Sequence, residues 1–258
     1  MRRRTRSEWT ASWRRSHPRR ACRWRSCTSC SDVDGTAFLA ALQLGDSLFP
    51  SGAFTQSSGL ETLLADGEVT DAAGLRALLR THLLHRLARA DLPVLLVVHA
   101  TGDLDTVLEA DRLLAAVKLT REERTASART GRRIAAEAAR LAPEPVLAAF
   151  AAAAAGGATP GNAAVAQGLA TRAFGIAAEP AALLACYAFA ASLVAAALRL
   201  MRVGHGDAQA VLRDGRADME AALEIARGAD WRDPRPCAPQ IDVAGARHER
   251  ATARLFAS

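Results

Sequence analysis

Two histidines are the first candidates for chemistry in this 258-residue chain. His82 and His85 stand three residues apart in an apolar, helix-forming stretch, so both could reach one metal ion from the same helix face. Two imidazoles without a third ligand make a poor metal site, and partly exposed helical histidines are common. A helical metal-dependent enzyme that uses this pair is therefore kept as an alternative.

Other candidates are single polar residues among small and apolar ones. His205 has a glycine on either side, where it could meet a passing ion, and Asp207 behind it could equally cap a helix. Glu61 is the only charged residue between positions 46 and 66, and it follows a turn rich in proline and glycine at positions 50–52. A carboxylate suits transient contact with a divalent transition metal because oxygen ligands hold such an ion less tightly than imidazole or thiolate.

The familiar signatures of enzymes are missing. The sequence contains no Gly-x-x-x-x-Gly-Lys-Ser/Thr loop, no Gly-x-Ser-x-Gly elbow and no His-Glu-x-x-His motif. Cys27 and Cys30 form a single CxxC without a second pair at zinc-site spacing, and Cys186 lies in an apolar run typical of a core. The odd number of cysteines and the lack of a secretory signal indicate a reducing cytoplasm. These patterns favour a non-enzymatic cytoplasmic protein.

The first 35 residues differ from the rest of the chain. They hold ten arginines against three acidic residues, a net charge of +7, whereas the whole chain carries +6 and residues 36–258 therefore carry −1. We interpret residues 1–35 as a disordered extension, or as a start codon assigned too early. The alternative is a nucleic-acid-binding arm that combines arginines with three tryptophans.

The rest of the chain predicts an all-α protein, because alanine and leucine dominate and no run of β-branched residues alternates. We expect a single compact bundle of about ten helices, with Asp71, Asp103 and Thr120 as N-caps and an extended tail from Gly228. Residues 180–198 carry no charge, but their alanine content favours a helix buried in the bundle over a membrane span. The expected helices span 36–44, 56–66, 72–90, 94–100, 104–117, 121–141, 145–155, 161–174, 179–200, 207–212, 217–227 and a short stretch near His248.

Four motifs in order resemble those of the UreF family of urease accessory proteins and together cover residues 36–258. The first comprises Leu42-Gln43-Leu44, Pro50-x-Gly52-x-Phe54 and Ser57-x-Gly59-Leu60-Glu61. The others are Lys118–Arg124 with Ser127 and Gly131, then Leu193–Leu200 with Gly204-x-x-Asp207-x-Gln209, and finally Ile241-Asp242-Val243, Arg247-His248-Glu249 and Arg254-Leu255-Phe256. The chain departs from the family where Asn162 replaces a common histidine and where His205 and Gly206 replace a more usual Gln-Thr/Ser pair.

This resemblance implies an all-α homodimer that acts as a scaffold and has no catalytic residues, no resident cofactor and no stable metal site. Its expected partners are the accessory protein UreD (also called UreH), the GTPase UreG and apo-urease, into which the complex inserts nickel with GTP hydrolysis. A channel proposed for the family places transient nickel passage near Glu61, Phe54, His205 and Asp207.

The C-terminal segment 229–258 is expected to bind partners. Its prolines and its polar residues suggest a segment that gains order mainly by contact, which is typical of association rather than of core packing. The residues expected to bind are Arg247, His248, Glu249, Arg254 and Phe256.

Overall fold

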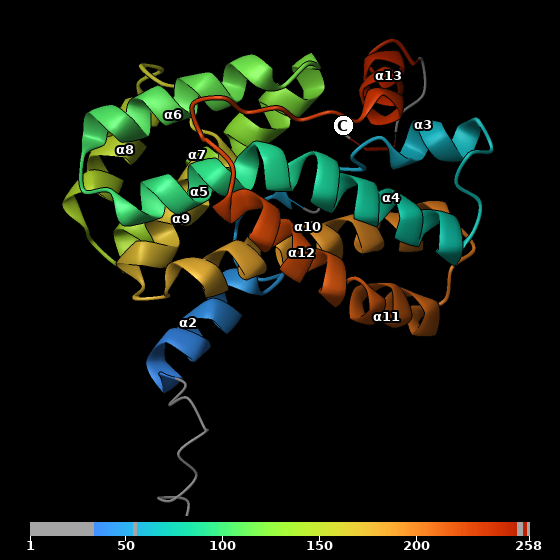
Figure 1. The fold of residues 1–258 in the computed structure, drawn as a ribbon, viewed down its shortest axis with the longest axis horizontal. Helices are drawn as coiled ribbons and strands as arrows, with labels where there is room; N and C mark the ends of the chain where they lie inside the picture. The colour runs from blue at the N-terminus through green and yellow to red at the C-terminus, as the bar shows by residue number, and fades with distance from the viewer. Residues whose placement is uncertain (1–33, 54–55, 252–254, 257–258) are drawn as a thin grey trace, which may run out of the picture. The chain divides into compact units, whose positions relative to one another are not determined.

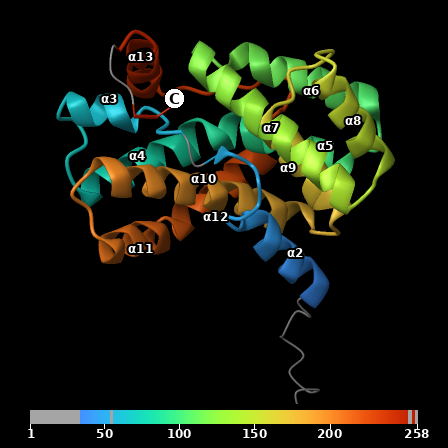
Figure 2. The same cartoon turned by 180° about the vertical axis from the view of Figure 1, so that it is seen from behind.

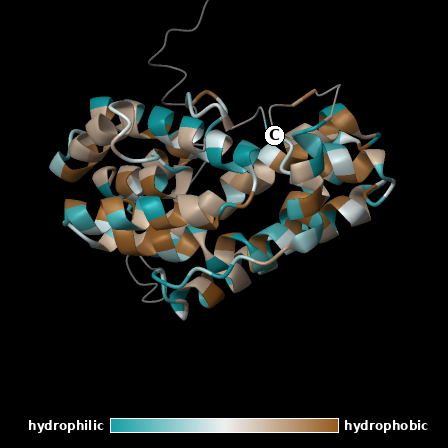
Figure 3. Ribbon diagram, turned by 90° about the horizontal axis from the view of Figure 1, so that it is seen from above, coloured by the Kyte–Doolittle hydropathy of each residue, from teal (hydrophilic) through white to brown (hydrophobic). Residues whose placement is uncertain are grey.

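The computed structural model describes residues 34–53, 56–251 and 255–256, and Gly35–Ser258 forms one compact unit. Over the described residues the chain contains twelve α-helices, one 3-10 turn and no β-strand, which confirms the predicted all-α bundle (Figure 1). Polar and apolar residues alternate around the helices (Figure 3). The α-helices are α2 (Gly35–Gly45), α3 (Leu60–Ala65), α4 (Ala72–His85), α5 (Asp91–Ala100), α6 (Leu104–Val117), α7 (Arg121–Leu141), α8 (Pro145–Ala155), α9 (Ala163–Ala173), α10 (Ala178–Leu200), α11 (His205–Asp214), α12 (Arg216–Arg227) and α13 (Pro239–His248).

Helix α10 lies at the centre of the bundle. It packs against α2, α3, α4, α5, α9, α11 and α12, and its many alanines let these helices approach closely. Within the described residues it is the one helix long and apolar enough to cross a membrane, but 56% of that apolar stretch is buried by the protein itself. Its apolar character is accounted for by its central position.

Helices α7 and α9 form the tightest helix pair (Figure 2). A Cβ atom at Gly131 of α7 would lie 2.2 Å from the carbonyl oxygen of Gly161, so only glycine fits there. The buried carboxylate of Asp111 on α6 holds the start of α9, accepting hydrogen bonds from the amides of Gly161 and Asn162 at 2.7 Å each. The side-chain amide of Asn162 also donates to Asp111, at 2.8 Å. Asn162, where the chain departs from the family pattern, therefore helps to join α9 to α6.

The predicted N-caps of the long helices are confirmed. Asp71 accepts from the amide of Gly74 at 2.8 Å, Asp103 from Thr106 at 2.9 Å and Thr120 from Glu123 at 3.1 Å. Each side chain satisfies an amide that has no partner within the first turn of its helix.

The predicted start of α3 near Gln56 is wrong. The helix begins at Leu60 after Ser58 and Gly59, whose φ angles are 51° and 85°, and it has no side-chain cap. Because two successive left-handed residues cannot continue a right-handed helix, the chain turns before α3.

The predicted helix 72–90 ends early, at His85. A helix running on into α5 would bring the ring of Pro93 against the carbonyl of Arg89, four residues earlier. The chain instead forms a 3-10 turn at Leu87–Arg89, and the carbonyls of His85 and Arg89 accept from the amides of Cys237 and Arg235. The segment that follows α12 thus runs along this break.

The C-terminal helix is longer than predicted and starts earlier, at Pro239. Proline suits the first turn of a helix because it has no amide hydrogen to satisfy. Ile241, Ala244 and His248 are buried against the body. Helix α13 is therefore already packed in the isolated chain.

Candidate functional site

Three distant parts of the sequence meet beside α13, where Figure 1 shows it next to α3. They are the start of α3, the first turn of α7, and the end of α13 together with Leu255 and Phe256. We define the anchoring cluster as the side chains of Glu61, Glu122, His248 and Glu249 together with the main chain of Leu255 and Phe256.

The carboxylate of Glu61 is the acceptor at the middle of this cluster. One oxygen accepts from the amide of Leu255 at 2.8 Å. The other accepts from the amide of Phe256 at 3.2 Å and lies 3.1 Å from Nε2 of His248. Glu61 reaches these groups from the second position of α3, where the positive end of the helix dipole also favours a carboxylate.

His248 is buried between two carboxylates. Its Nδ1 lies 2.7 Å from Glu122 of α7, while its Nε2 faces Glu61. Each ring nitrogen therefore has a carboxylate oxygen within hydrogen-bonding distance. The two nitrogens point away from each other, so the carboxylates lie on opposite sides of the ring and share no position for a metal ion. Across the described part of the chain, no three such side chains are arranged to hold one.

Two further contacts fix the end of α13. Glu249 accepts from the amide of Glu122 at 3.0 Å, in the first turn of α7, where an acidic side chain is favoured. Arg247 forms a two-pronged ion pair with Asp66, one contact of which measures 2.9 Å. Helix α13 is thus bound to both α3 and α7.

The two residues that close the described chain face different ways. Phe256 is buried, with the guanidinium of Arg199 on α10 at 5.9 Å from its ring, whereas the side chain of Leu255 is 80% exposed.

Partial burial raises the pKa of Glu61, but the hydrogen bonds from Leu255, His248 and Phe256 outweigh it and hold that pKa below its ordinary value. Glu61 is therefore ionised near neutral pH.

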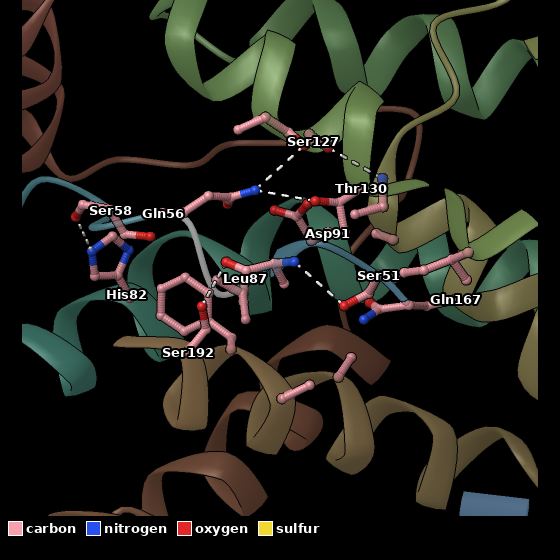
Figure 4. Close-up of a pocket in the computed structure, with 18 of the residues that line it drawn as sticks. Ser51, Gln56, Ser58, His82, Leu87, Asp91, Ser127, Thr130, Gln167 and Ser192 are labelled. Atoms are coloured by element: carbon pink, nitrogen blue, oxygen red, sulfur yellow. Dashed lines mark hydrogen bonds between the residues drawn. The ribbon is translucent and has the colours of Figure 1, made fainter. Parts of the chain in front are cut away.

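A pocket of about 240 Å³ lies beside the cluster, under the connection between α2 and α3. Side chains from three helices hold this connection (Figure 4). Ser192 donates to the carbonyl of Ala53 at 2.9 Å, the side chain of Gln56 donates to Thr130 at 3.1 Å, and His82 lies 3.0 Å from the carbonyl of Ser58.

Charged residues form one wall of the pocket. Arg86 makes ion pairs with Glu123 and Asp242, and Lys118 makes them with Asp91 at 2.9 Å and Glu123 at 3.5 Å. Burial alone would raise the pKa of Glu123, but the two cations outweigh it and lower that pKa. Burial would lower the pKa of Lys118, and Asp91 and Glu123 raise it instead. We call these five residues the interior network; each of its charges lies against at least one opposite charge within the protein.

The two histidines that could have shared a metal do not meet. His82 is buried against the ring of Phe189, and burial followed by the charge of Arg86 lowers its pKa to about 3, whereas His85 is exposed. The helix turns one imidazole into the core and the other toward solvent. This geometry does not support the alternative of a metal enzyme built on the pair.

The other predicted site residues fall into three groups. Glu61, His248, Glu249 and Phe256 come together in the anchoring cluster, with Arg247 beside them. His205 and Asp207 are exposed in the first turn of α11, with no described contact to that cluster. Phe54 and Arg254 lie outside the described residues, as does the CxxC.

Sequence reasoning gave no role to Glu122, Asp66 or the interior network. Glu122, Glu123 and Asp242 all fall inside the motifs that carry the family resemblance, which was the available signal. The partner of Glu122 lies 126 residues away and that of Asp242 lies 156 residues away, so no local pattern reveals these two pairings.

Comparison with known proteins identifies the family. A sequence model of the UreF family matches residues 69–215, more than half of the chain. The chain belongs to the UreF family. A urease accessory protein UreF from Yersinia pestis (strain Pestoides F) is 31% identical over 229 residues, which cover 88% of this chain and all of the relative. Similar proteins of the same name from Yersinia pseudotuberculosis (strain IP32953) and Yersinia enterocolitica are each 30% identical, with the same coverage.

The first and last motifs of the UreF resemblance supply most side chains of the anchoring cluster, and Glu122 comes from the motif at Lys118–Arg124. In this chain the N- and C-terminal motifs therefore meet in space.

Proposed function

We propose that this protein is a non-enzymatic scaffold of a GTP-dependent complex that inserts nickel into apo-urease in the cytoplasm. Its partners in this proposal are UreD/UreH, the GTPase UreG and apo-urease, and it acts as a homodimer. The alignment with urease accessory proteins over 88% of the chain carries the proposal. Nickel is the cargo of the complex and not a resident cofactor.

The geometry of the anchoring cluster supports a scaffold role. Its polar side chains are hydrogen-bonded to one another or to the main chain, so they position the end of the chain. The cluster also leaves Leu255 and, on α13, Val243 exposed at 80% and 57%. Exposed apolar side chains on a fixed segment suit association with another protein.

We propose the end of α13 and the residues after it as the partner-binding segment, with Arg247, His248, Glu249, Arg254 and Phe256 as its functional residues. In this view His248 and Glu249 act by positioning, because they face the body. The side chains that touch a partner are the exposed ones.

The nickel route through Glu61, Phe54, His205 and Asp207 stays a prediction. The contacts of Glu61 favour a different contribution, in which its carboxylate acts on nickel delivery by holding the partner-binding segment. Both ideas predict impaired urease activation when the charge of Glu61 is removed. They differ in whether the partners are still captured normally.

The experiment is reconstitution of urease in cells that carry the urease genes but lack this protein. With the full chain supplied, we expect active, nickel-containing urease and co-purification with UreD/UreH and UreG. The isolated chain is expected to hydrolyse no GTP. Full activation of urease without the chain, or failure to capture any partner, would overturn the proposal.

A further inference from the structure

The outward face of α7 carries an unusual concentration of positive charge. Arginines recur along it at steps of three, four and seven residues, which places them on one side of the helix. Figure 2 shows α7 at the front of the molecule in that view. We call this the arginine face; its members are Arg121, Arg129, Arg132, Arg133 and Arg140.

The acidic residues of α7 do not balance this face. Glu122 is bound to His248 and Glu123 to the interior network, so both are directed into the protein. Glu137 is paired with Arg140 at 2.6 Å. In the part of the chain that the structure describes, Arg121, Arg132 and Arg133 are exposed and have no carboxylate partner.

The arrangement is unfavourable for the helix by itself. Arg121 places a positive charge in the first turn, at the positive end of the helix dipole. An external acidic group would relieve this effect.

The neighbouring surface is uncharged. Helix α8 packs along α7 and has the sequence PVLAAFAAAAA, and its Ala148, Ala152 and Ala155 are exposed. Positive charges beside a flat surface of small side chains can approach another protein closely.

We propose that the arginine face is a docking surface for an acidic protein surface on a partner in urease maturation. The inference rests on the proposed function. A protein fits better than a nucleic acid because the positive charge is local. The body at residues 36–258 carries a net charge of −1, so a long polyanion would meet repulsion beyond this one helix. A compact acidic surface matches the face without that penalty.

The test compares two triple variants of the full chain. Arg121→Gln, Arg132→Gln and Arg133→Gln together neutralise the unpaired part of the face while keeping side-chain length and helix propensity. The matched control carries Arg112→Gln, Arg202→Gln and Arg216→Gln, which are exposed arginines on other parts of the molecule. Circular dichroism and gel filtration confirm that both variants fold as the parent protein does.

Binding to purified apo-urease, to UreD/UreH and to UreG is then measured separately between 50 and 500 mM NaCl, concentrations of about this range being enough to screen exposed charges. We expect the face variant to bind one of these proteins about tenfold or more weakly at low salt, with a reduced salt dependence, while the control binds like the parent. Equal binding by the two variants to every protein overturns the inference.

Two other outcomes are informative. If the parent chain binds none of the three proteins, the proposed function fails before the arginine face is tested. If the face variant loses binding only to phosphatidylglycerol vesicles or to single-stranded RNA, used as probes in the same salt series, the surface serves a membrane or a nucleic acid and the inference is wrong.

Discussion

Helix α13 is held at its two ends by two different kinds of polar contact. At its start, Asp242 joins the interior network through Arg86, whose side chain is only 11% exposed and which also pairs with Glu123. At its end, His248 and Glu249 belong to the anchoring cluster, where main-chain amides supply several of the hydrogen bonds. One end is fixed by buried ion pairs and the other mainly by hydrogen bonds.

The difference lies in what breaking each contact costs. Removing one member of a buried ion pair leaves its partner charged and unsolvated, which is strongly destabilising. Breaking the hydrogen bonds of Glu61 releases amides that water can satisfy, at the end of the chain. The start of α13 should thus behave as part of the core, and its end as a segment that can respond to partners.

The largest effect should come from removing most of α13. Deletion of residues 241–258 removes the buried Ile241, Ala244 and His248 and takes Asp242 away from Arg86, so we expect unfolding free energy to fall by at least about 4 kcal/mol. Deletion of residues 251–258 removes mainly the burial of Phe256 and should cost about 1–2 kcal/mol. Urea denaturation measures both values. Equal losses would contradict the division between the two ends.

The next effect is that of Arg86→Met. Asp242 would then lose its cation and Glu123 would keep only Lys118, so we expect a loss of about 3–5 kcal/mol in unfolding free energy. Arg140→Met removes an exposed ion pair of the same residue types from α7 and should cost less than about 1 kcal/mol. A loss for Arg86→Met as small as for this control would show that the interior network is dispensable.

A pH-dependent effect, absent at neutral pH, is expected from His82. Its pKa falls to about 3 in the folded protein from an ordinary 6.5, so below pH 6.5 the unfolded chain binds a proton that the folded protein excludes. Stability should therefore fall as the pH drops from 6.5 toward 3, by up to about 1.4 kcal/mol per pH unit from this residue.

The control for His82 is the exposed histidine three residues later. The variant His82→Gln should show a flatter decline of stability between pH 6.5 and 4 than the parent, measured by urea denaturation at each pH. His85→Gln should leave the decline unchanged. A parallel pH profile for His82→Gln would remove this histidine from the account of acid sensitivity.

The smallest effect on stability, and the most specific one on function, belongs to Glu61→Gln. The amide keeps one acceptor but loses the charge facing His248, so we expect a cost of about 1 kcal/mol, faster hydrogen exchange at the amides of Leu255 and Phe256, and weaker capture of a partner. In the parent the lowered pKa of Glu61 means that its stabilisation is present above pH about 4.5 and is lost as the pH falls through the folded-state value.

Glu68→Gln is the matched control, because it removes an exposed carboxylate from the loop after α3. It should change neither hydrogen exchange nor partner capture. If Glu61→Gln captures its partners normally but still delivers little nickel to urease, the carboxylate acts on the metal and the anchoring role in function is wrong.

Much of the fold could be predicted from the sequence because its signals are local. Alanine and leucine content predicts helix, and the caps at Asp71, Asp103 and Thr120 act within three residues of their targets. The predicted helix 72–90 was wrong where contacts with residues far along the chain replace the local helical pattern. Periodicity continued through Arg89, but α4 ends at His85, and the carbonyls of His85 and Arg89 accept from the amides of Cys237 and Arg235.

Sequence patterns indicated some members of the candidate site, but neither Glu122 nor the arrangement. The motifs singled out Glu61 and His248, yet the two are 187 residues apart in the chain, and no spacing along a helix relates them. The sequence by itself determined the all-α class, most of the helices and the family. Only the tertiary structure decided that Glu61 binds the C-terminal segment, that His82 is buried while His85 is exposed, and that the acidic residues of α7 turn inward. The physical reason is that hydrogen bonds and ion pairs depend on distance in space, whereas sequence patterns report only neighbours along one element.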